Sequence, residues 1–270
     1  MAKVVLITGV SSGFGKAISE LLSVKGYIVY GISRKQPEDL TGGIKVLQGD
    51  VTDVASVQKA ISTLLVHEGR IDILINNAGM GISGSVEDSS LEDIHLQMST
   101  NFMGYVNMIQ AVLPSMRKQG SSTIVNISSI GGLMGLPYQG FYAASKFAVE
   151  GMSESLRMEL IPFHIKVIVI QPGDFHTSFT ANRQPVISEG NNSDYAVQFQ
   201  KTLSLIEKDE KGGLKPEFLA LKLAKILAKK NPCHSYIIAT LEQKFAVVLK
   251  RILPGSLFSS ILSSHYGIKS

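Results

Sequence analysis

The sequence has 270 residues, of which 44% are hydrophobic and 18% are charged, and its formal net charge is +4. This composition favours one globular domain, residues 1–270, with a large core over two very small domains. The one cysteine excludes an internal disulfide and favours a reducing, cytoplasmic location, and the six histidines form no cluster with metal-ligand spacing, so we expect no metal site.

The first unit of the chain combines a strand, a glycine turn and a helix. Residues 3–8 (KVVLIT) read as a buried strand, TGVSSGFG follows at 8–15, and the next segment is typical of a helix. Glycines let the backbone approach a pyrophosphate, and the helix N-terminus offers it free N–H groups. We therefore predict dinucleotide binding here; the alternative is a glycine-rich turn without a ligand. The predicted contacts are Gly9, Ser11, Ser12, Gly13, Phe14 and Gly15.

The second strand, residues 27–33, ends in a serine followed by two cations. NAD-binding domains usually place an acidic residue at this position, where it binds the ribose 2′-hydroxyl. Here Ser33, Arg34 and Lys35 occupy it. A serine and an arginine suit a 2′-phosphate, so the sequence favours NADP(H) over NAD(H). The alternative for Arg34 is a solvated loop charge.

The next two strands also end in polar or small residues. A strand over 45–51 ends at Asp50 and Val51, where an acceptor could meet the adenine amino group, and a helix is expected over 53–67. A strand over 71–79 ends in two asparagines, which could tie strand ends together and present backbone to the cofactor. The strand–helix alternation predicts a parallel sheet with helices on both faces. The cofactor contacts predicted at the end of this strand are Asn77, Ala78 and Gly79.

A tyrosine and a lysine follow the fifth strand. Residues 91–118 read as one long helix interrupted at Pro114, with Asn101 in a buried stripe, and the strand 122–129 ends at Ser129. Tyr142 and Lys146 stand four residues apart in the next helix, so both side chains lie on one face. An ammonium beside a phenol should lower its pKa from about 10, which makes an acid–base catalyst. Alone, the pair also fits an ordinary half-exposed helix face.

The alternation stops after the sixth strand, residues 165–173, which ends at Pro172 and Gly173. Residues 174–215 are predicted to be a substrate lid, followed by a helix (216–230) and a strand (235–240). The tail, 241–270, is amphipathic, and residues 211–270 carry ten Lys/Arg against two Asp/Glu. The tail could contact a membrane surface, cap the substrate cleft or pack on a partner subunit. No aromatic-interleaved basic stripe indicates nucleic acid.

These motifs, in this order, resemble the short-chain dehydrogenase/reductases. The resemblance rests on TGVSSGFG, NNAG, the Asn101 helix, NISS, Tyr142-x-x-x-Lys146 and PGDFHT. It implies an α/β, single-domain Rossmann-type fold with a doubly wound parallel sheet of about seven strands and a C-terminal helical lid. It also implies an oxidoreductase that uses NAD(P), and a homodimer or homotetramer paired through the Asn101 and Tyr142 helices. Met152, Leu156 and Leu160 would permit such pairing but also suit a core.

The resemblance assigns roles to the matching residues. Tyr142 would be the general acid in reduction, and Lys146 would hold the nicotinamide ribose and lower the pKa of Tyr142. Ser129, thirteen residues before Tyr142, would hydrogen-bond the substrate carbonyl. Asn101 would help a water chain deliver protons to the lysine, and Thr177 would hold the nicotinamide carboxamide. Pro172 and Gly173 complete the predicted cofactor contacts.

A closer likeness is to the branch of estradiol 17-beta-dehydrogenase and photoreceptor-type retinol dehydrogenase. It rests on GGLMGLPYQGFYAASKFAVEGMSESLRMEL, PGDFHTSF and NNAGMGISG, and it implies an apolar steroid-, retinoid- or lipid-like substrate. The alternative is a non-catalytic NADP(H)-binding sensor, but such proteins usually lack the tyrosine or the lysine. The expected cleft walls, unless they belong to the core, are Met80, Ile82, Leu133, Met134, Leu136, Phe175 and Phe179.

Overall fold

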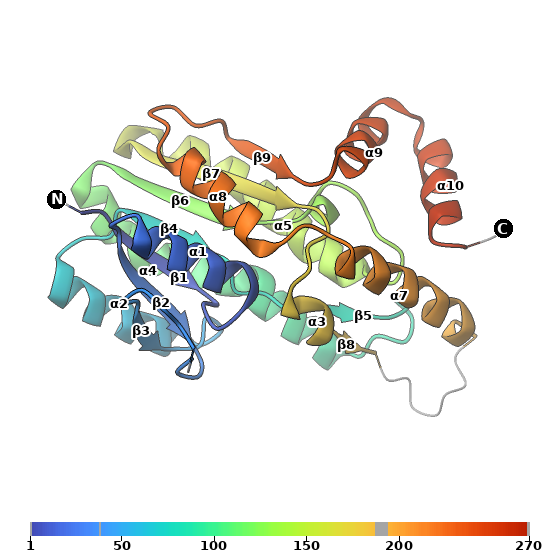
Figure 1. The fold of residues 1–270 in the computed structure, drawn as a ribbon, viewed down its shortest axis with the longest axis horizontal. Coiled ribbons are helices and arrows are strands. Elements are labelled where there is room, and N and C mark those ends of the chain that lie inside the picture. The colour runs from blue at the N-terminus through green and yellow to red at the C-terminus, as the bar shows by residue number, and fades with distance from the viewer. Residues whose placement is uncertain (1, 38, 187–193, 269–270) are drawn as a thin grey trace.

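The computed structural model describes residues 2–37, 39–186 and 194–268. Seven parallel strands form one sheet in the order β3-β2-β1-β4-β6-β7-β9 (Figure 1), which confirms the Rossmann-type prediction. The strand order reverses between β1 and β4, and ligands of such sheets bind beyond the strand ends at this point. The strands are β1 Val4–Thr8, β2 Ile28–Ser33, β3 Lys45–Gln48, β4 Ile73–Asn76, β6 Ser122–Ile127, β7 Ile165–Pro172 and β9 Ser235–Ile238.

Helices cover both faces of the sheet because its central strands bury side chains on both sides. In β1, Val5 and Ile7 pack toward the face of α1 and α8, whereas Val4 and Leu6 pack toward the other face. All four are at most 1% exposed, and burying each large apolar side chain contributes roughly 1.5–3 kcal/mol. The first face is covered by α1 (Gly13–Val24) and α8 (Pro216–Leu227), and the second by α2 (Val54–Glu68), α4 (Gly104–Gln119) and α5 (Gly140–Glu159).

The helix predicted over 91–118 is interrupted at a different place from the one expected. It consists of α3 (Leu91–Met98), a π-helical turn (Ser99–Met103) and α4, which runs through Pro114. The prediction of a break at Pro114 is therefore wrong. The buried residues Val112 and Met116 hold both sides of the proline against the core. The π-turn instead contains Asn101, and such turns occur often at functional sites.

Three apolar positions at and just beyond the C-terminal half of α5 belong to the core and do not form a subunit face. Leu156 and Leu160 are buried, and Met152 packs against the same cluster under the sheet. The exposed apolar residues of this helix are Phe147 and Met158, at 46% and 61% exposure. Pairing of subunits thus stays a prediction, with a different set of residues available to it.

The segment predicted to be a lid, 174–215 and called the lid below, is joined to the body by a pair of strands that the sequence did not suggest. β5 (Ile82–Ser83) pairs in parallel with β8 (Gln184–Pro185). The helices on either side of β8 are α6 (Ser178–Ala181) and α7 (Ala196–Lys211), and part of the predicted lid, 187–193, lies outside the described residues. Short 3-10 turns occupy Ile130–Gly132 and Ile161–Phe163.

The tail forms two helices, α9 (Leu241–Ile252) and α10 (Gly255–His265), which lie beyond β9 in Figure 1. Val247 and Phe258 bury themselves against Met134 in the loop after β6. The hydroxyl of Thr202 in α7 donates to the carbonyl of Tyr266, 3.3 Å away. The tail thus packs over the loop and the lid. Among the described residues, no helix is long and apolar enough to cross a membrane.

Candidate active site

The carboxyl ends of the central strands are held together by side-chain amides. Nδ2 of Asn76 donates to Oδ1 of Asn126 on β6 at 2.9 Å. Nδ2 of Asn77 donates to the carbonyl of Thr8 at 2.9 Å, and the Thr8 hydroxyl accepts from the backbone N–H of Asn77 and of Ala78. The predicted role of the two asparagines as ties between strand ends is confirmed. The contribution of Thr8 was missed, because a threonine at a strand end carries no distinctive signal.

The glycine turn between β1 and α1 is built for close approach. Gly9 and Gly13 have φ of +73° and +54°, which favour glycine. A Cβ at Gly15 would lie 2.0 Å from the carbonyl oxygen of Gly9, so only glycine fits there. Ser12 is the N-cap of α1 but makes no side-chain capping bond, and no acidic residue occupies the first turn. The free N–H groups and the positive end of the helix dipole therefore suit a pyrophosphate.

The other predicted cofactor contacts lie at the same edge of the sheet. Ser33 ends β2 and is buried, and Arg34 follows it with an exposed side chain. Oδ1 of Asp50 accepts from the backbone N–H and the hydroxyl of Thr52 at 2.9 and 2.8 Å, so this carboxylate shapes its own turn. Val51 is buried, at 8% exposure, and its side chain packs against Gly104. A Cβ added to Gly104 would lie 2.7 Å from Cγ2 of Val51.

The end of β7 faces the glycine turn. A Cβ on Gly13 would lie 3.6 Å from Cβ of Thr177, so these two segments are neighbours. The Thr177 hydroxyl accepts from the N–H of Phe179 and caps α6. Gly173, after Pro172, leaves room for the side chain of Gln243, whose Oε1 would lie 2.1 Å from an added Cβ. Gln243 in turn donates to Oδ2 of Asp174 at 2.6 Å.

Tyr142, Ser129 and Lys146 meet at the centre of this edge. The Ser129 hydroxyl lies close enough to the Tyr142 phenol to lower its pKa, and it also accepts from the N–H of Gly131 at 3.0 Å. Lys146 is 4% exposed, and its Nζ donates to the carbonyl of Ile127 at 2.9 Å. The same ammonium lies 5.9 Å from the centre of the Tyr142 ring and 5.3 Å from that of Tyr105. The structure thus brings the predicted tyrosine, serine and lysine into one cluster.

Burial controls the ionisation of this cluster. Burial raises the pKa of Tyr142 to about 12, and the hydrogen bond from Ser129 only partly opposes it. Loss of water around the phenol dominates, so the expected lowering of the Tyr142 pKa by Lys146 stays a prediction. Burial lowers the pKa of Lys146 to about 8, against the charge of Glu150 one turn later. Glu150 was not predicted, although its four-residue spacing from Lys146 was a usable signal.

Asn101 is fully buried, as its place in an apolar stripe predicted. Its Oδ1 accepts from the N–H of Met80 at 2.8 Å, and its Nδ2 donates to the carbonyl of Met80 at 2.9 Å and to Ser145 Oγ at 3.2 Å. Ser145 donates to the carbonyl of Tyr142. Asn101 therefore ties the loop after β4 to the helix of Tyr142 and Lys146. Its part in a proton relay stays a prediction.

The expected apolar walls divide between cleft and core. Phe179 of the lid lies against Tyr142, with ring centres 5.7 Å apart. Phe175 belongs to the core instead, where its ring meets Phe14 edge-on at 4.9 Å. Phe14, expected at the cofactor, therefore has a packing role as well. Met134 is covered by the tail helices, and Leu133 and Leu136 pack around it, whereas Ile82 is buried in β5 and Met80 is half-buried.

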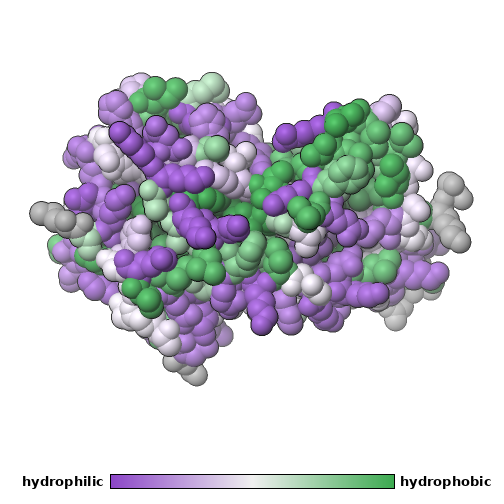
Figure 2. Space-filling view, turned by 45° about the horizontal axis from the view of Figure 1, so that its top comes forward, coloured by the Kyte–Doolittle hydropathy of each residue, from purple (hydrophilic) through white to green (hydrophobic). Residues whose placement is uncertain are grey.

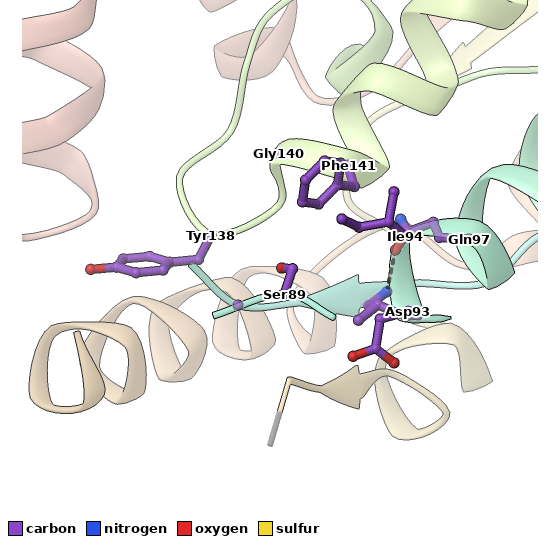
Figure 3. A pocket seen from close by; sticks show the side chains of 9 residues that line it. Ser89, Asp93, Ile94, Gln97, Tyr138, Gly140 and Phe141 are labelled. Carbon is purple, nitrogen blue, oxygen red and sulfur yellow. Dashed lines mark hydrogen bonds between the residues drawn. The ribbon is translucent and has the colours of Figure 1, made fainter. Parts of the chain in front are cut away.

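A small cavity lies beside this site, at the start of α5 (Figure 3). Oε1 of Gln97 accepts from the N–H of Ile82 at 2.9 Å, the bond drawn in Figure 3. Tyr138, Phe141 and Asp93 also line it, whereas Tyr142 and Ser129 do not. It is separate from the cluster that could do chemistry. Within the described residues, no group of three or more His, Cys, Asp or Glu side chains could hold a metal ion.

Comparison with known proteins assigns the chain to a family. The model of the short chain dehydrogenase family matches residues 3–187. The 3-ketodihydrosphingosine reductase of Bacteroides thetaiotaomicron is 49% identical over 267 residues, 99% of each protein. Human 17-beta-hydroxysteroid dehydrogenase type 1 is 39% identical over 191 residues, 65% of this chain and 58% of that protein. A short-chain dehydrogenase from Streptomyces avermitilis superposes with a TM-score of 0.83 at 29% identity, covering 99% and 98% of the two chains. The chain therefore belongs to the short-chain dehydrogenase/reductase family, near the branch that contains estradiol 17-beta-dehydrogenase.

Proposed function

We propose that this oxidoreductase reduces the ketone of a long-chain lipid with NADPH. The observation that carries the proposal is the cluster in which the Ser129 hydroxyl and the Tyr142 phenol lie close together and the buried Lys146 ammonium lies 5.9 Å from the centre of the Tyr142 ring. Two hydroxyls at one point can meet the charge that grows on a carbonyl oxygen. The non-catalytic alternative has no use for such a cluster.

The ionisation of the cluster suits reduction. When bound, NADPH supplies the hydride that converts the carbonyl carbon to an alcohol carbon. Because the pKa of Tyr142 is raised to about 12, its phenol keeps its proton near neutral pH and can give it to the nascent alkoxide. Ser129 would donate a second hydrogen bond to the same oxygen. Lys146, whose Nζ donates to the carbonyl of Ile127, would hold a ribose hydroxyl of the cofactor.

The preference for NADP(H) rests on the end of β2. Ser33, Arg34 and Lys35 stand there, and both cations are exposed at the edge where the cofactor ribose belongs. We expect Arg34→Asp to weaken NADPH binding at least tenfold with little effect on NADH, since it replaces a phosphate donor by a like charge. Titration of each cofactor, followed by its fluorescence, measures this. Tighter binding of NADH than of NADPH by the unmodified protein would contradict the assignment.

The lipid substrate is supported by apolar residues at the site and by the relative that acts on 3-ketodihydrosphingosine. Phe179 presents an aromatic face beside Tyr142, and Leu133 and Leu136 follow Ser129. Apolar walls around a few polar groups are what an amphiphilic ketone needs. We expect NADPH consumption with 3-ketodihydrosphingosine well above that with steroid or retinoid carbonyls. No consumption with any carbonyl would favour the non-catalytic alternative.

The outer face of the tail helices α9 and α10 carries exposed apolar residues that could contact a lipid surface. In α9, Leu241, Phe245, Val248 and Ile252 recur at four-, three- and four-residue steps and are 84%, 60%, 47% and 72% exposed. This spacing places all four on one face of the helix. On α10, Leu257 and Ile261 are 49% and 46% exposed. Figure 2 shows these helices as a hydrophobic patch at one end of the molecule.

Basic side chains accompany this patch. Lys244 and Arg251 are exposed and follow the same helical spacing, beside the apolar stripe of α9. An apolar face bordered by cations suits anionic lipid headgroups, and a protein partner without acidic residues would leave the cations unmatched. We therefore also propose that α9 and α10 lie on an anionic membrane, from which the substrate enters.

Sedimentation with vesicles tests the contact. The chain should bind vesicles of phosphatidylcholine and phosphatidylglycerol more tightly than vesicles of phosphatidylcholine alone, and high salt should weaken binding. Phe245→Ser with Ile252→Ser should reduce binding at least tenfold, because it removes two apolar anchors. Val24→Ser with Val66→Ser, at 82% and 84% exposure elsewhere, is the matched control. Equal binding by both double variants, or dissociation of a dimer by the first one without any lipid binding, would overturn the proposal.

A further inference from the structure

An ion pair inside the lid stands out because both partners are buried. Arg183, between α6 and β8, donates from Nη2 to Oε1 of Glu210 in α7. The two side chains are only 3% and 12% exposed. The hydroxyl of Thr180 donates to the other carboxylate oxygen at 2.6 Å. Each carboxylate oxygen of Glu210 thus accepts a hydrogen bond, one from Arg183 and one from Thr180. Glu210 in turn holds one side of the Arg183 guanidinium in place.

The guanidinium is only partly satisfied by these contacts. Among the described residues, Nε and Nη1 of Arg183 are buried and have no hydrogen-bond partner. Together they carry three N–H groups. Leaving a buried charged donor unpaired is costly, and buried polar groups in native proteins almost always have a partner. The unpaired side of the fork is therefore a place for a ligand that accepts hydrogen bonds.

This side of the lid adjoins the reacting groups. The Phe179 ring lies 5.7 Å from Cζ of Arg183 and 5.7 Å from the Tyr142 ring, so one aromatic side chain spans the gap. The charges of Glu210 and Arg183 also act on the pKa of Tyr142, the first raising it and the second lowering it. A polar group a few bonds from the reacting carbonyl would thus come within reach of the guanidinium.

We propose that Arg183 is a specificity-determining residue that donates hydrogen bonds to an oxygen on the polar end of the substrate, two carbons from the ketone. The substrate class is a long-chain ketone with a hydroxyl at that position, as 3-ketodihydrosphingosine has at carbon 1. Glu210 holds the guanidinium in place through its ion pair with Arg183. This inference rests on the proposed function and identifies the part of the substrate to which Arg183 would donate hydrogen bonds.

Matched substrates and matched variants test it. The kcat/KM of NADPH-driven reduction is compared for 3-ketodihydrosphingosine and its 1-deoxy analogue, which lacks only the hydroxyl. In the unmodified protein the hydroxylated ketone should be favoured about 10- to 100-fold, the range of a hydrogen bond from a charged donor. The double variant Arg183→Met, Glu210→Gln removes both charges together and leaves no unpaired carboxylate. It should reduce the two ketones at nearly equal kcat/KM.

Two further variants and the NADPH affinity complete the test. Arg183→Lys keeps the ion pair with Glu210 but loses the N–H groups of the guanidinium that point away from it. The preference for the hydroxylated ketone should therefore fall, while NADPH affinity stays the same. Arg117→Met, on the far end of α4, should keep the full preference. Equal reduction of both ketones by the unmodified protein would overturn the role of Arg183 and leave the proposed function standing. Reduction of neither ketone would overturn both.

Discussion

Replacing Lys146 by methionine should stabilise the fold while it abolishes turnover. The side chain is 4% exposed, and burial lowers its pKa from 10.5 to about 8. This lowering of the pKa corresponds to about 3 kcal/mol. Below pH 8, burial of the ammonium therefore reduces the free energy of unfolding by about that amount. Methionine avoids this cost but loses the hydrogen bond to Ile127, about 1 kcal/mol. The net gain at pH 6.5 should therefore be about 2 kcal/mol.

The sign of the pH dependence makes this prediction sharp. Between pH 8 and 10.5 the unfolded chain binds more protons than the folded chain, so the stability of the unmodified protein should rise with pH across this window. The gain from Lys146→Met should vanish there and reverse at pH 10.5. Urea unfolding followed by far-UV circular dichroism measures both proteins. A flat profile for the unmodified protein, with a variant less stable at pH 6.5, would refute the account of a desolvated lysine.

Two further substitutions probe the cofactor turn and a carboxyl beside the site. Gly15→Ala puts a Cβ 2.0 Å from the Gly9 carbonyl oxygen, so we expect a lower melting temperature and at least tenfold weaker NADPH binding. Gly151→Ala, inside α5 with open space around it, should leave NADPH binding unchanged and should not lower the melting temperature. Burial raises the pKa of Asp174 to about 6 from 3.8, so the folded chain binds more protons in that window and stability falls as pH rises through it. Asp174→Asn should therefore stabilise the protein at pH 7.5 by up to about 3 kcal/mol and have little effect at pH 3.5; equal effects at both values would contradict this.

Much of the fold could be predicted because strand and helix periods repeat along the chain. Runs such as KVVLIT predict strands of a parallel sheet, and the structure has a strand at each of the seven predicted places. Strand ends in such a sheet meet at one edge, which is why residues as distant in sequence as Gly9, Ser129 and Thr177 could be assigned to one site. The membership of the family is confirmed by the comparisons.

The rest depends on tertiary contacts that leave no local pattern. The π-turn at Asn101 gave no signal, whereas Pro114 gave a misleading one, because burial of its helix outweighs the local cost of proline. The raised pKa of Tyr142 could not be anticipated, since sequence spacing shows the nearby charge but not the loss of water. The pairing of β5 with β8 and the bond of Arg183 to Glu210 join segments far apart in the chain.

Other predictions stay open. The cytoplasmic location and the homo-oligomer are still expectations from the sequence. A subunit contact should be sought at the exposed apolar residues of the two helices predicted to pair. These are Phe147 and Met158 on α5, and Met103 in the π-turn that contains Asn101. The absence of nucleic-acid partners and of a metal likewise stays a prediction.

The proton-donating role of Tyr142 is the central claim, and one substitution tests it. Tyr142→Phe keeps the ring that packs on Phe179 and removes only the hydroxyl beside Ser129. We measure NADPH oxidation with 3-ketodihydrosphingosine and NADPH binding by fluorescence on the same preparation. The account predicts a loss of turnover by at least a thousandfold with cofactor affinity kept within about threefold, in the range of general acid catalysis and a lost hydroxyl donor. Turnover close to that of the unmodified protein would contradict it.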